Sequence, residues 1–307
     1  MLGTPATTII AGEGVPVTPA LALHSPKVVT AVEHIRRMRG GSQAHLMRCS
    51  DGHFYVVKFK NNPQSPRVLV NEYIAGRLAR LMKLPCPNFC LVEVSEDLIH
   101  LTPDLLVEVP RGRMPVAAGL AFGSQHPTWQ SGKRRILLPI LELRVAVSLG
   151  PVENLSELSG ILVFDKWTAN NDGRQISCLE LPTEQSKAFR MFMYDNGFCF
   201  GGADWEFKQW PREGLYDEKA VYSKIKINQD VHPWLERLEA NITTEDLRMI
   251  AEELPESWIS DDRDELLRML NCLYERKSIV PSLIRLTLDW LRERNYLGFA
   301  RAATAGG

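Results

Sequence analysis

The sequence predicts an α+β protein in which a β-rich N-terminal body precedes a mostly helical C-terminal body. Residues 28–60 form short apolar runs separated by glycine-containing turns, which is typical of strands. Residues 110–133 are rich in glycine, proline and serine, which favours a connector. The last third shows apolar residues at helical spacing. A chain of 307 residues can bury a core in each of two such bodies.

Composition and charge exclude several classes of protein. Hydrophobic residues make up 45% of the chain and charged residues 24%, as in ordinary soluble proteins. The net charge of −1 gives no general attraction to nucleic acid or to an anionic membrane. The N-terminus lacks the basic and apolar regions of a secretory signal, and residues 136–149 are too short and too charged to span a bilayer. We therefore expect a cytoplasmic protein.

The cysteines and histidines show neither a disulfide framework nor a metal-binding pattern. The 6 cysteines contain no CxxC pair, and the 7 histidines show no ligand spacing. We expect reduced, mostly buried thiols and no zinc site.

The N-terminal body begins, after a loose arm over residues 1–27, with three expected strands. Between the second and third strands, Asp51-Gly52 predicts a two-residue type I′ hairpin, which needs positive φ at both central positions. The expected strands are Val28–Met38, Ala44–Arg48 and His53–Lys60.

Lys58 and Glu72 are the first candidate pair. Strand alternation places Lys58 on the same face as Phe54 and Val56. The next segment, residues 68–83, has apolar residues at spacings of three and four and predicts a helix that carries Glu72. Because the offset is only 14 residues (72 − 58), this helix can pack back on the strand.

The remaining elements follow from the same patterns. Thr243 or Thr244 is the expected N-cap of the first C-terminal helix. Further strands are expected at residues 90–94, 99–101, 178–181 and 189–194, and helices at residues 155–167, 244–254, 264–276 and 281–294.

Two acids in separate loops suggest chemistry on phosphate. The segment FDKWTANNDGRQ places Asp165, Asn170, Asn171 and Asp172 in a polar loop after a helix, and Asp195 follows an apolar run just before Asn-Gly. Phosphoryl transfer needs one acid to orient a hydroxyl and a second to hold Mg²⁺ against ATP phosphates. Asp and Asn are also common in plain turns, so the order of the parts matters more than either loop.

That order runs from a glycine loop between strands to a lysine on the next strand, a glutamate on the next helix, a connector and the two acids. Glycines let backbone N–H groups approach phosphate oxygens, and the glutamate can hold the lysine through an ion pair. Taken one at a time, a hairpin glycine pair, an exposed lysine and a surface glutamate need no such explanation.

The chain resembles the HipA-like kinases, bacterial proteins with a two-lobed protein-kinase-like fold, and in particular their compact branch. The resemblance covers about residues 28–280 and rests on RGGSQAHLM, YVVKFK, NEYIAGRLARLMKLP, GILVFDKWTANNDGRQ and MYDNGFCF. It implies a bilobal fold, with a small β-rich N-lobe and one packed helix over residues 28–125. A larger, mostly helical C-lobe would occupy residues 126–307.

The resemblance also implies roles for individual residues. Asp172 corresponds to the catalytic aspartate and Asp195 to the metal-binding aspartate, while Arg174 would contact a phosphate or pair with one of the acids. Some HipA-like kinases phosphorylate a serine in their own phosphate loop, although a turn-forming hydroxyl is the simpler role for Ser42. The residues expected to contact the phosphates or to brace that contact are Gly40, Gly41, Ser42, Gln43, Lys58 and Glu72.

One position departs from the family pattern. The asparagine metal ligand normally follows the catalytic acid by five residues, and here that position is Ser177. Gln175, Asn171 and Asn170 are the alternatives. Asp165 and Asn170 are themselves five apart, but the apolar run before Asp165 favours a place at the helix end.

The expected function is an ATP- and Mg²⁺-dependent kinase that acts on a serine or threonine hydroxyl of a protein. The alternative is a pseudokinase-type nucleotide-binding module that regulates a partner protein without phosphoryl transfer, and Ser177 supports it. A structural α+β protein without a ligand is the third reading. The acceptor, the oligomeric state and a regulatory partner are not encoded in any segment that we can interpret.

Overall fold

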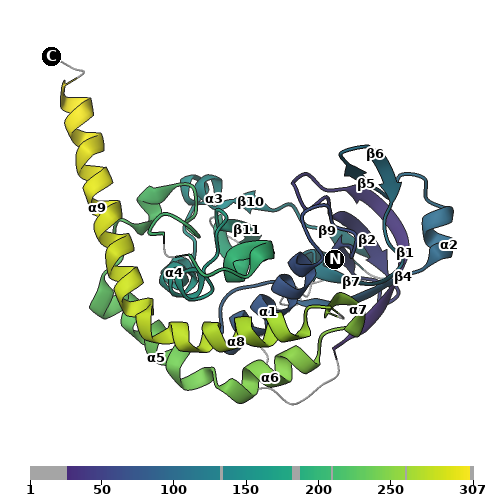
Figure 1. Ribbon diagram of the computed structural model, residues 1–307. Helices are drawn as coiled ribbons and strands as arrows, with labels where there is room; N and C mark the ends of the chain where they lie inside the picture. The colour runs from purple at the N-terminus through teal and green to yellow at the C-terminus, as the bar shows by residue number, and fades with distance from the viewer. Residues whose placement is uncertain (1–25, 132–133, 182–186, 209, 260, 305–307) are drawn as a thin grey trace, which may run out of the picture.

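The computed structural model describes residues 26–131, 134–181, 187–208, 210–259 and 261–304. A β-rich part and a helical part lie side by side, with helix α1 (Arg67–Leu81) between them (Figure 1). The loose arm expected at residues 1–27 falls almost wholly outside the described residues.

The β-rich part is built on a closed five-stranded barrel in the order β1-β2-β3-β7-β4. Only the β1–β4 pairing, which closes the barrel, is parallel. Its strands are β1 (Val28–Arg37), β2 (His45–Cys49), β3 (Phe54–Lys58), β4 (Phe89–Val94) and β7 (Gly119–Gln125).

Strand alternation on β3 separates the barrel core from Lys58. Tyr55 and Val57 are buried inside the barrel with Phe59, which follows the strand. Lys58 lies on the opposite face, as the sequence pattern predicts.

The turn between β2 and β3 is not the expected type I′ hairpin. Only Gly52 has positive φ (76°), and the Gly52 N–H donates to the Cys49 carbonyl oxygen at 2.9 Å. A longer turn that ends on one left-handed glycine is the common three-residue alternative. The prediction failed because Asp-Gly suits both turns.

Two other predictions in this part are wrong. Residues 99–101 are not a strand; Ile99 and His100 end helix α2 (Glu96–His100), whose N-cap Ser95 accepts a hydrogen bond from the Leu98 N–H. The connector expected at residues 110–133 contains β7, a central barrel strand. Its glycines misled the prediction, because Gly123 is present for close packing: a Cβ there would overlap the Val92 side chain.

Two hairpins flank the barrel. Strands β5 (Leu106–Val109) and β6 (Gly112–Pro115) form one, and β8 (Thr128–Ser131) and β9 (Arg134–Leu137) form the other.

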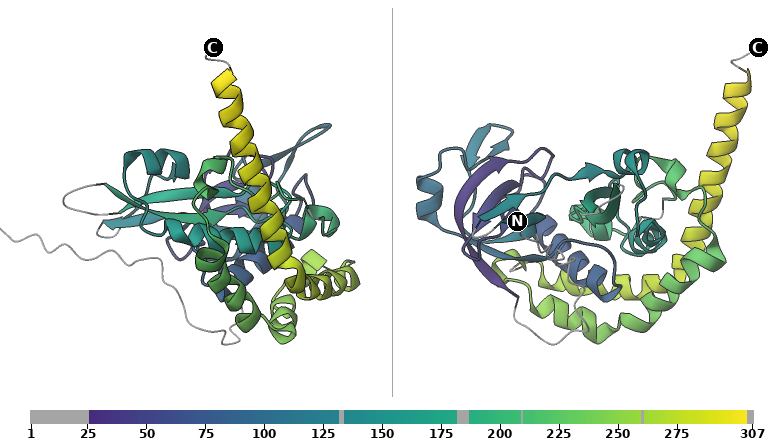
Figure 2. Two further views of the ribbon diagram at one scale, coloured as in Figure 1. Left: turned by 90° about the vertical axis from the view of Figure 1, so that its left-hand side faces the viewer. Right: turned by 180° about the vertical axis from the view of Figure 1, so that it is seen from behind.

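Helix α1 packs against both parts of the molecule. Its inner residues share one hydrophobic cluster with Leu91 and Phe122 of the barrel and with the helical part. Gly76 lets the helix approach β4, since a Cβ there would lie 2.6 Å from the Phe89 ring. The view from behind also shows α1 between the barrel and the C-terminal helices (Figure 2).

The helical part contains a three-stranded sheet next to helix α4 (Leu158–Trp167), which is buried along its whole length. The other elements before residue 225 are β10 (Leu141–Glu142), α3 (Leu143–Leu149), η1 (Leu155–Glu157), β11 (Gln175–Leu181), β12 (Ala188–Tyr194), η2 (Cys199–Asp204) and η3 (Lys219–Tyr222).

The C-terminal helices wrap around α4 and α1 (Figures 1 and 2). Thr243 is the N-cap of α6, and it forms a capping box with Asp246, which confirms the expected start. The π-helix η4 and helix α5 were not predicted. These elements are η4 (Ile227–Val231), α5 (His232–Asn241), α6 (Thr244–Glu252), α7 (Glu256–Ile259), α8 (Arg263–Arg276), η5 (Lys277–Ile279) and α9 (Val280–Thr304). None of the described helices is both long and apolar enough to cross a bilayer.

Replacing Gly160 of α4 by alanine should destabilise the protein by about 1–3 kcal/mol, because the added Cβ would overlap the Trp234 ring of α5. The higher helix propensity of alanine offsets only about 1 kcal/mol of this cost. Urea unfolding measures the effect. In a Trp234→Ala background the same substitution should be neutral or stabilising, and an equal cost in both backgrounds would contradict the contact.

Two histidines join the first barrel strands to β5. The fully buried His45 places Nδ1 2.9 Å from His34 Nε2 and places Nε2 3.1 Å from the Leu106 carbonyl oxygen. Because a carbonyl oxygen only accepts, Nε2 carries the hydrogen, and in the neutral ring Nδ1 accepts from His34. Burial lowers the pKa of His45 to about 4.

Acidification from pH 7 to pH 5 should therefore weaken the fold through His45. The unfolded chain, with a histidine pKa of 6.5, takes up a proton over this range, whereas the folded ring does not. Protonation then favours the unfolded state, by about 2 kcal/mol at pH 5. Urea unfolding at both pH values should show this loss in wild type and a smaller one in His45→Asn; equal losses would refute the assignment.

Candidate functional site

Lys58 lies at the centre of the candidate site. It ends β3 and points away from the barrel interior toward α1. Its Nζ is 2.5 Å from Glu72 Oε1 of α1 and 2.7 Å from Asp195 Oδ1, which directly follows β12. A strand, a helix and a turn thus meet at one ammonium group, as the order of the sequence motifs predicts.

The electrostatics favour the charged forms of Lys58 and Asp195. Burial alone would lower the pKa of Lys58, but Asp195 and Glu72 outweigh it and raise the pKa above its ordinary value. The ammonium of Lys58 lowers the pKa of Asp195, and burial raises that of Glu72. The Asp195 side chain is 37% exposed, against 8% for Lys58 and 4% for Glu72. Solvent therefore reaches the cluster at Asp195.

The polar loop after α4 separates its two acids. Asp165 is buried in the last turns of α4, where it accepts hydrogen bonds from Asn170 and Arg174. Asp172 is exposed, and its Oδ1 accepts from the Gly173 N–H at 2.7 Å. The expected place of Asp165 at the helix end is confirmed. Of the two acids, only Asp172 is open to an incoming group.

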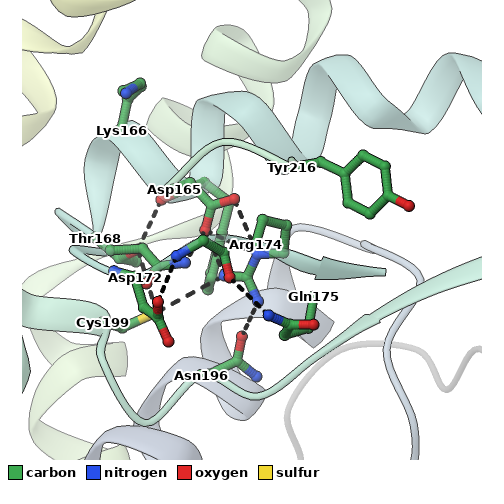
Figure 3. Close-up of polar contacts among 12 residues, drawn as sticks. Asp165, Lys166, Thr168, Asp172, Arg174, Gln175, Asn196, Cys199 and Tyr216 are labelled. Carbon is green, nitrogen blue, oxygen red and sulfur yellow. Dashed lines mark hydrogen bonds and ion pairs between the residues drawn. The ribbon is translucent and has the colours of Figure 1, made fainter. Parts of the chain in front are cut away.

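Arg174 connects this loop to the chain around Asp195. Its side chain is fully buried, and it pairs with Asp165 through Nε and Nη2 (Figure 3). Its Nη1 donates to the Tyr194 carbonyl oxygen at 3.0 Å and to Asn196 Oδ1 at 2.9 Å. Of the two roles that the sequence left open for Arg174, these contacts match the pair with an acid.

The candidate metal ligands beside Asp195 differ in exposure. Gln175 is exposed and lies opposite Tyr194, the residue before Asp195, in the β11–β12 ladder. Ser177 is buried and lies two residues farther along, opposite Phe192.

The two asparagines that were alternatives at this site also differ. Asn170 is already bonded to Asp165, whereas the buried Oδ1 of Asn171 has no hydrogen-bond partner among the residues that the structure describes. No group of three His, Cys, Asp or Glu side chains that could hold a metal occurs in the part of the chain that the structure describes. Of the two carboxylates bonded to Lys58, only that of Asp195 is exposed.

The glycine loop joins β1 to β2. Gly40 has φ 121°, a conformation open to glycine but strained for other residues, and both Gly40 and Gly41 are exposed. Ser42 presents its carbonyl oxygen to Asn62 Nδ2 at 3.3 Å. The loop thus exposes backbone at the positions where the sequence places phosphate contacts.

The side chain of Gln43 is hydrogen-bonded within the protein. Its Nε2 donates to the Glu108 carbonyl oxygen at 2.9 Å, and its Oε1 accepts from the Glu108 N–H at 2.6 Å. Arg37 also donates to Oε1, at 3.1 Å. The Gln43 side chain therefore fastens the glycine loop to β5.

Sequence reasoning missed two buried polar residues at this site, Asn71 and Lys166. Asn71 precedes Glu72 and contacts the chain after Asp195. Lys166 points away from the Asp165–Arg174 pair (Figure 3), and its Nζ donates to the carbonyl oxygens of Pro211 at 2.7 Å and Glu213 at 2.5 Å. The available signal was a polar residue within an otherwise apolar helix.

Comparison with known proteins agrees with this geometry. A protein-family model described as HipA-like kinase matches residues 31–182, and no curated protein matches by sequence. The proinflammatory kinase CtkA of Helicobacter pylori is similar in structure, with a TM-score of 0.52 and 12% identity over 86% of this chain and 98% of CtkA.

Two other solved structures resemble the chain more weakly. The Golgi casein kinase has a TM-score of 0.43 and 12% identity over 87% of this chain and 74% of its own. HipA of Shewanella oneidensis MR-1, in a complex with HipB and operator DNA, has a TM-score of 0.39 and 12% identity over 83% of this chain and 65% of its own.

At 12% identity, the likeness to CtkA shows the fold, a mixed α+β kinase fold. The segment matched by the family model contains the glycine loop, Lys58, Glu72 and the polar loop with Asp172. The resemblance predicted from the motifs is therefore confirmed: residues 31–182 match the HipA-like kinase family.

Proposed function

We propose that this protein transfers the γ-phosphoryl group of ATP, with Mg²⁺, to a serine or threonine hydroxyl of a protein. One observation carries the proposal: the Lys58 ammonium bridges Glu72 of α1 and Asp195 after β12. A strand lysine braced by a helix glutamate, next to an acid that can hold metal, is the arrangement that kinases use.

Lys58 and the glycine loop would bind the nucleotide. ATP would supply the phosphoryl group, and Mg²⁺ would neutralise the charge that develops on the phosphate oxygens. Lys58 places a positive charge opposite phosphate oxygens, and Glu72 holds that charge in position. Gly40, Gly41 and Ser42 offer backbone N–H groups without a large side chain in the way. Gln43 keeps the loop attached to β5.

Asp195 would hold the metal. It is the most exposed carboxylate of the cluster, and Gln175 lies opposite the preceding residue, Tyr194, in the sheet. Mg²⁺ is usually bound by one or two carboxylates together with phosphate oxygens and water, so this small donor set fits the ion. Ser177 is a poorer candidate because its side chain is buried in β11.

Asp172 would orient the acceptor hydroxyl and take its proton. It is exposed, and the Gly173 N–H fixes one carboxylate oxygen. Its loop is joined through Arg174 to the residues on both sides of Asp195. The loop that carries Asp172 and the chain around Asp195 would thus be joined by one buried cation.

We assign residues 28–125 to an N-lobe and residues 126–307 to a C-lobe. The first range ends where β7 ends, and it contains the whole barrel and α1. The β8–β9 hairpin falls in the second range but lies beside the barrel (Figure 1), where Arg135 approaches Gly52. We place the protein in the cytoplasm, acting on a protein substrate, alone or with a regulatory partner.

A second function has one specific observation in its favour. Ser177 replaces the family's asparagine ligand, and its buried position opposite Phe192 keeps it out of the site. A chain that binds nucleotide with a single metal ligand would regulate a partner without transfer. Nucleotide binding without any transfer from radiolabelled ATP, to casein or to the protein itself, would favour this reading.

Asp172→Asn should lower phosphoryl transfer about 10²- to 10⁴-fold, because the amide cannot accept the hydroxyl proton. Transfer is measured with γ-labelled ATP, both to the protein itself and to dephosphorylated casein. Affinity for Mg-ATP should stay within about threefold of wild type, since Asp172 does not contact Lys58. Full activity in this variant would show that another group is the base.

Asp195→Asn should weaken Mg-ATP about tenfold or more, equivalent to about 1.4 kcal/mol or more, because the metal loses its charged ligand. Calorimetric titration with and without Mg²⁺ measures the effect. Affinity for metal-free ATP should rise or stay constant, because Lys58 loses a competing carboxylate. An equal loss in both titrations would contradict the metal-binding role.

A further inference from the structure

Asn71 of α1 is enclosed at the place where the helix meets the chain after Asp195. Its side chain has no exposed surface. Nδ2 donates to the Gly197 carbonyl oxygen at 2.8 Å and to the Gly202 carbonyl oxygen at 3.0 Å. Oδ1 accepts from Trp205 Nε1 at 2.8 Å. One amide therefore contacts three points within nine residues of chain.

The contacted chain, residues 196–205, has an unusual backbone. Phe200 and Trp205 have positive φ, as does Asp195 immediately before the segment. Non-glycine residues adopt this conformation only where surrounding contacts hold it. Part of that support comes from the polar loop, because the Phe200 N–H donates to the Thr168 carbonyl oxygen at 2.5 Å. From the side of α1, Asn71 supports the segment together with Arg67, whose Nη1 donates to the Ala203 carbonyl oxygen at 3.0 Å.

Successive residues of α1 thus act on both partners of one ion pair. Glu72 holds Lys58 at 2.5 Å, and Asn71 holds the carbonyl oxygen of Gly197, two residues after Asp195. Asp195 in turn pairs with Lys58 at 2.7 Å. Because the helix is one rigid element, the position of Asp195 relative to Lys58 is fixed by two adjacent side chains.

Only an amide satisfies this site. Two carbonyl oxygens require two N–H donors, and the Trp205 N–H requires an acceptor. Aspartate would keep the acceptor but remove both donors, and it would bury a negative charge against two carbonyl oxygens. The requirement explains a polar residue on the buried face of α1.

We propose that Asn71 is a positioning residue for nucleotide-bound metal: it clamps residues 196–205 to α1 and thereby aims the Asp195 carboxylate. This inference rests on the proposed kinase function, because its test measures nucleotide affinity. The clamp acts through Asp195, so it governs the metal-dependent part of nucleotide affinity. Contacts of the glycine loop and Lys58 with the phosphates do not depend on it directly.

The test compares Asn71→Asp with wild type in calorimetric titrations of ADP and ATP, with and without Mg²⁺. Wild type should bind both nucleotides more tightly with Mg²⁺. Asn71→Asp should lose at least tenfold in Mg-nucleotide affinity and less than threefold in metal-free affinity. Hydrogen exchange of the amides in residues 196–205 should quicken at least tenfold. Asn71→Ser, which keeps one donor, gives an intermediate result if the aspartate variant does not fold.

A control variant separates positioning from general damage. Asn154 is another buried asparagine, bonded to Met191 N and O and to Glu157, with no contact to residues 196–205. Asn154→Asp should lower stability but leave the effect of Mg²⁺ unchanged.

The outcomes are distinguishable. If wild type binds neither nucleotide, the proposed function itself fails. If wild type binds and Asn71→Asp retains the full effect of Mg²⁺, only the positioning role is wrong. The same conclusion follows if Asn154→Asp loses the effect of Mg²⁺ as strongly as Asn71→Asp.

Discussion

A single buried ammonium group, that of Lys58, holds the functional part of this molecule together. Taking such a charge out of water costs several kcal/mol, and nearby carboxylates must offset that cost. Glu72 and Asp195 do so at 2.5 and 2.7 Å. Since the three residues come from a barrel strand, a helix and a turn after a second sheet, none of these elements can move far without leaving a charge unpaired.

This constraint explains why α1 is fastened so firmly to the helical part. Arg67 at its start pairs with Asp262 at 2.6 Å, and Arg77 near its end pairs with Glu253 at 2.6 Å. Between them, Asn71 bonds to the chain after Asp195. The helix lies against the barrel on one side and is bonded to the helical part along its length. The Lys58–Glu72 pair therefore belongs to both parts of the molecule.

The same principle organises the polar loop. Arg174 is a second fully buried cation, and it pairs with Asp165 while it bonds to the residues on both sides of Asp195. Lys58 thus pairs with Asp195 itself, and Arg174 bonds the residue on each side of it. Asp172 and Asp195 are the exposed acids of the site, whereas Glu72 and Asp165 are buried and paired with Lys58 and Arg174. Two carboxylates therefore remain accessible at the surface of a packed core.

Much of this arrangement was predictable from local patterns. Strand alternation set the face of Lys58, helix periodicity placed Glu72 near it, and the apolar run placed Asp165 in α4. Residues with long-range partners were not predictable in the same way. The three hydrogen-bond partners of Asn71 follow it in the sequence by 126, 131 and 134 residues. No local sequence pattern encodes such distant contacts. Strand β7 was hidden because glycine marks close packing as well as loops.

The most direct test of the account is a crystal structure with Mn²⁺ and a non-hydrolysable ATP analogue, read through the anomalous signal of the metal. The account predicts one metal peak about 2.2 Å from an Asp195 carboxylate oxygen, with Lys58 Nζ within hydrogen-bonding distance of a phosphate oxygen. Clear density for the analogue away from Lys58 and Asp195 would contradict the account. So would a bound analogue with Asp195 turned away from the metal and Lys58 still paired to Glu72.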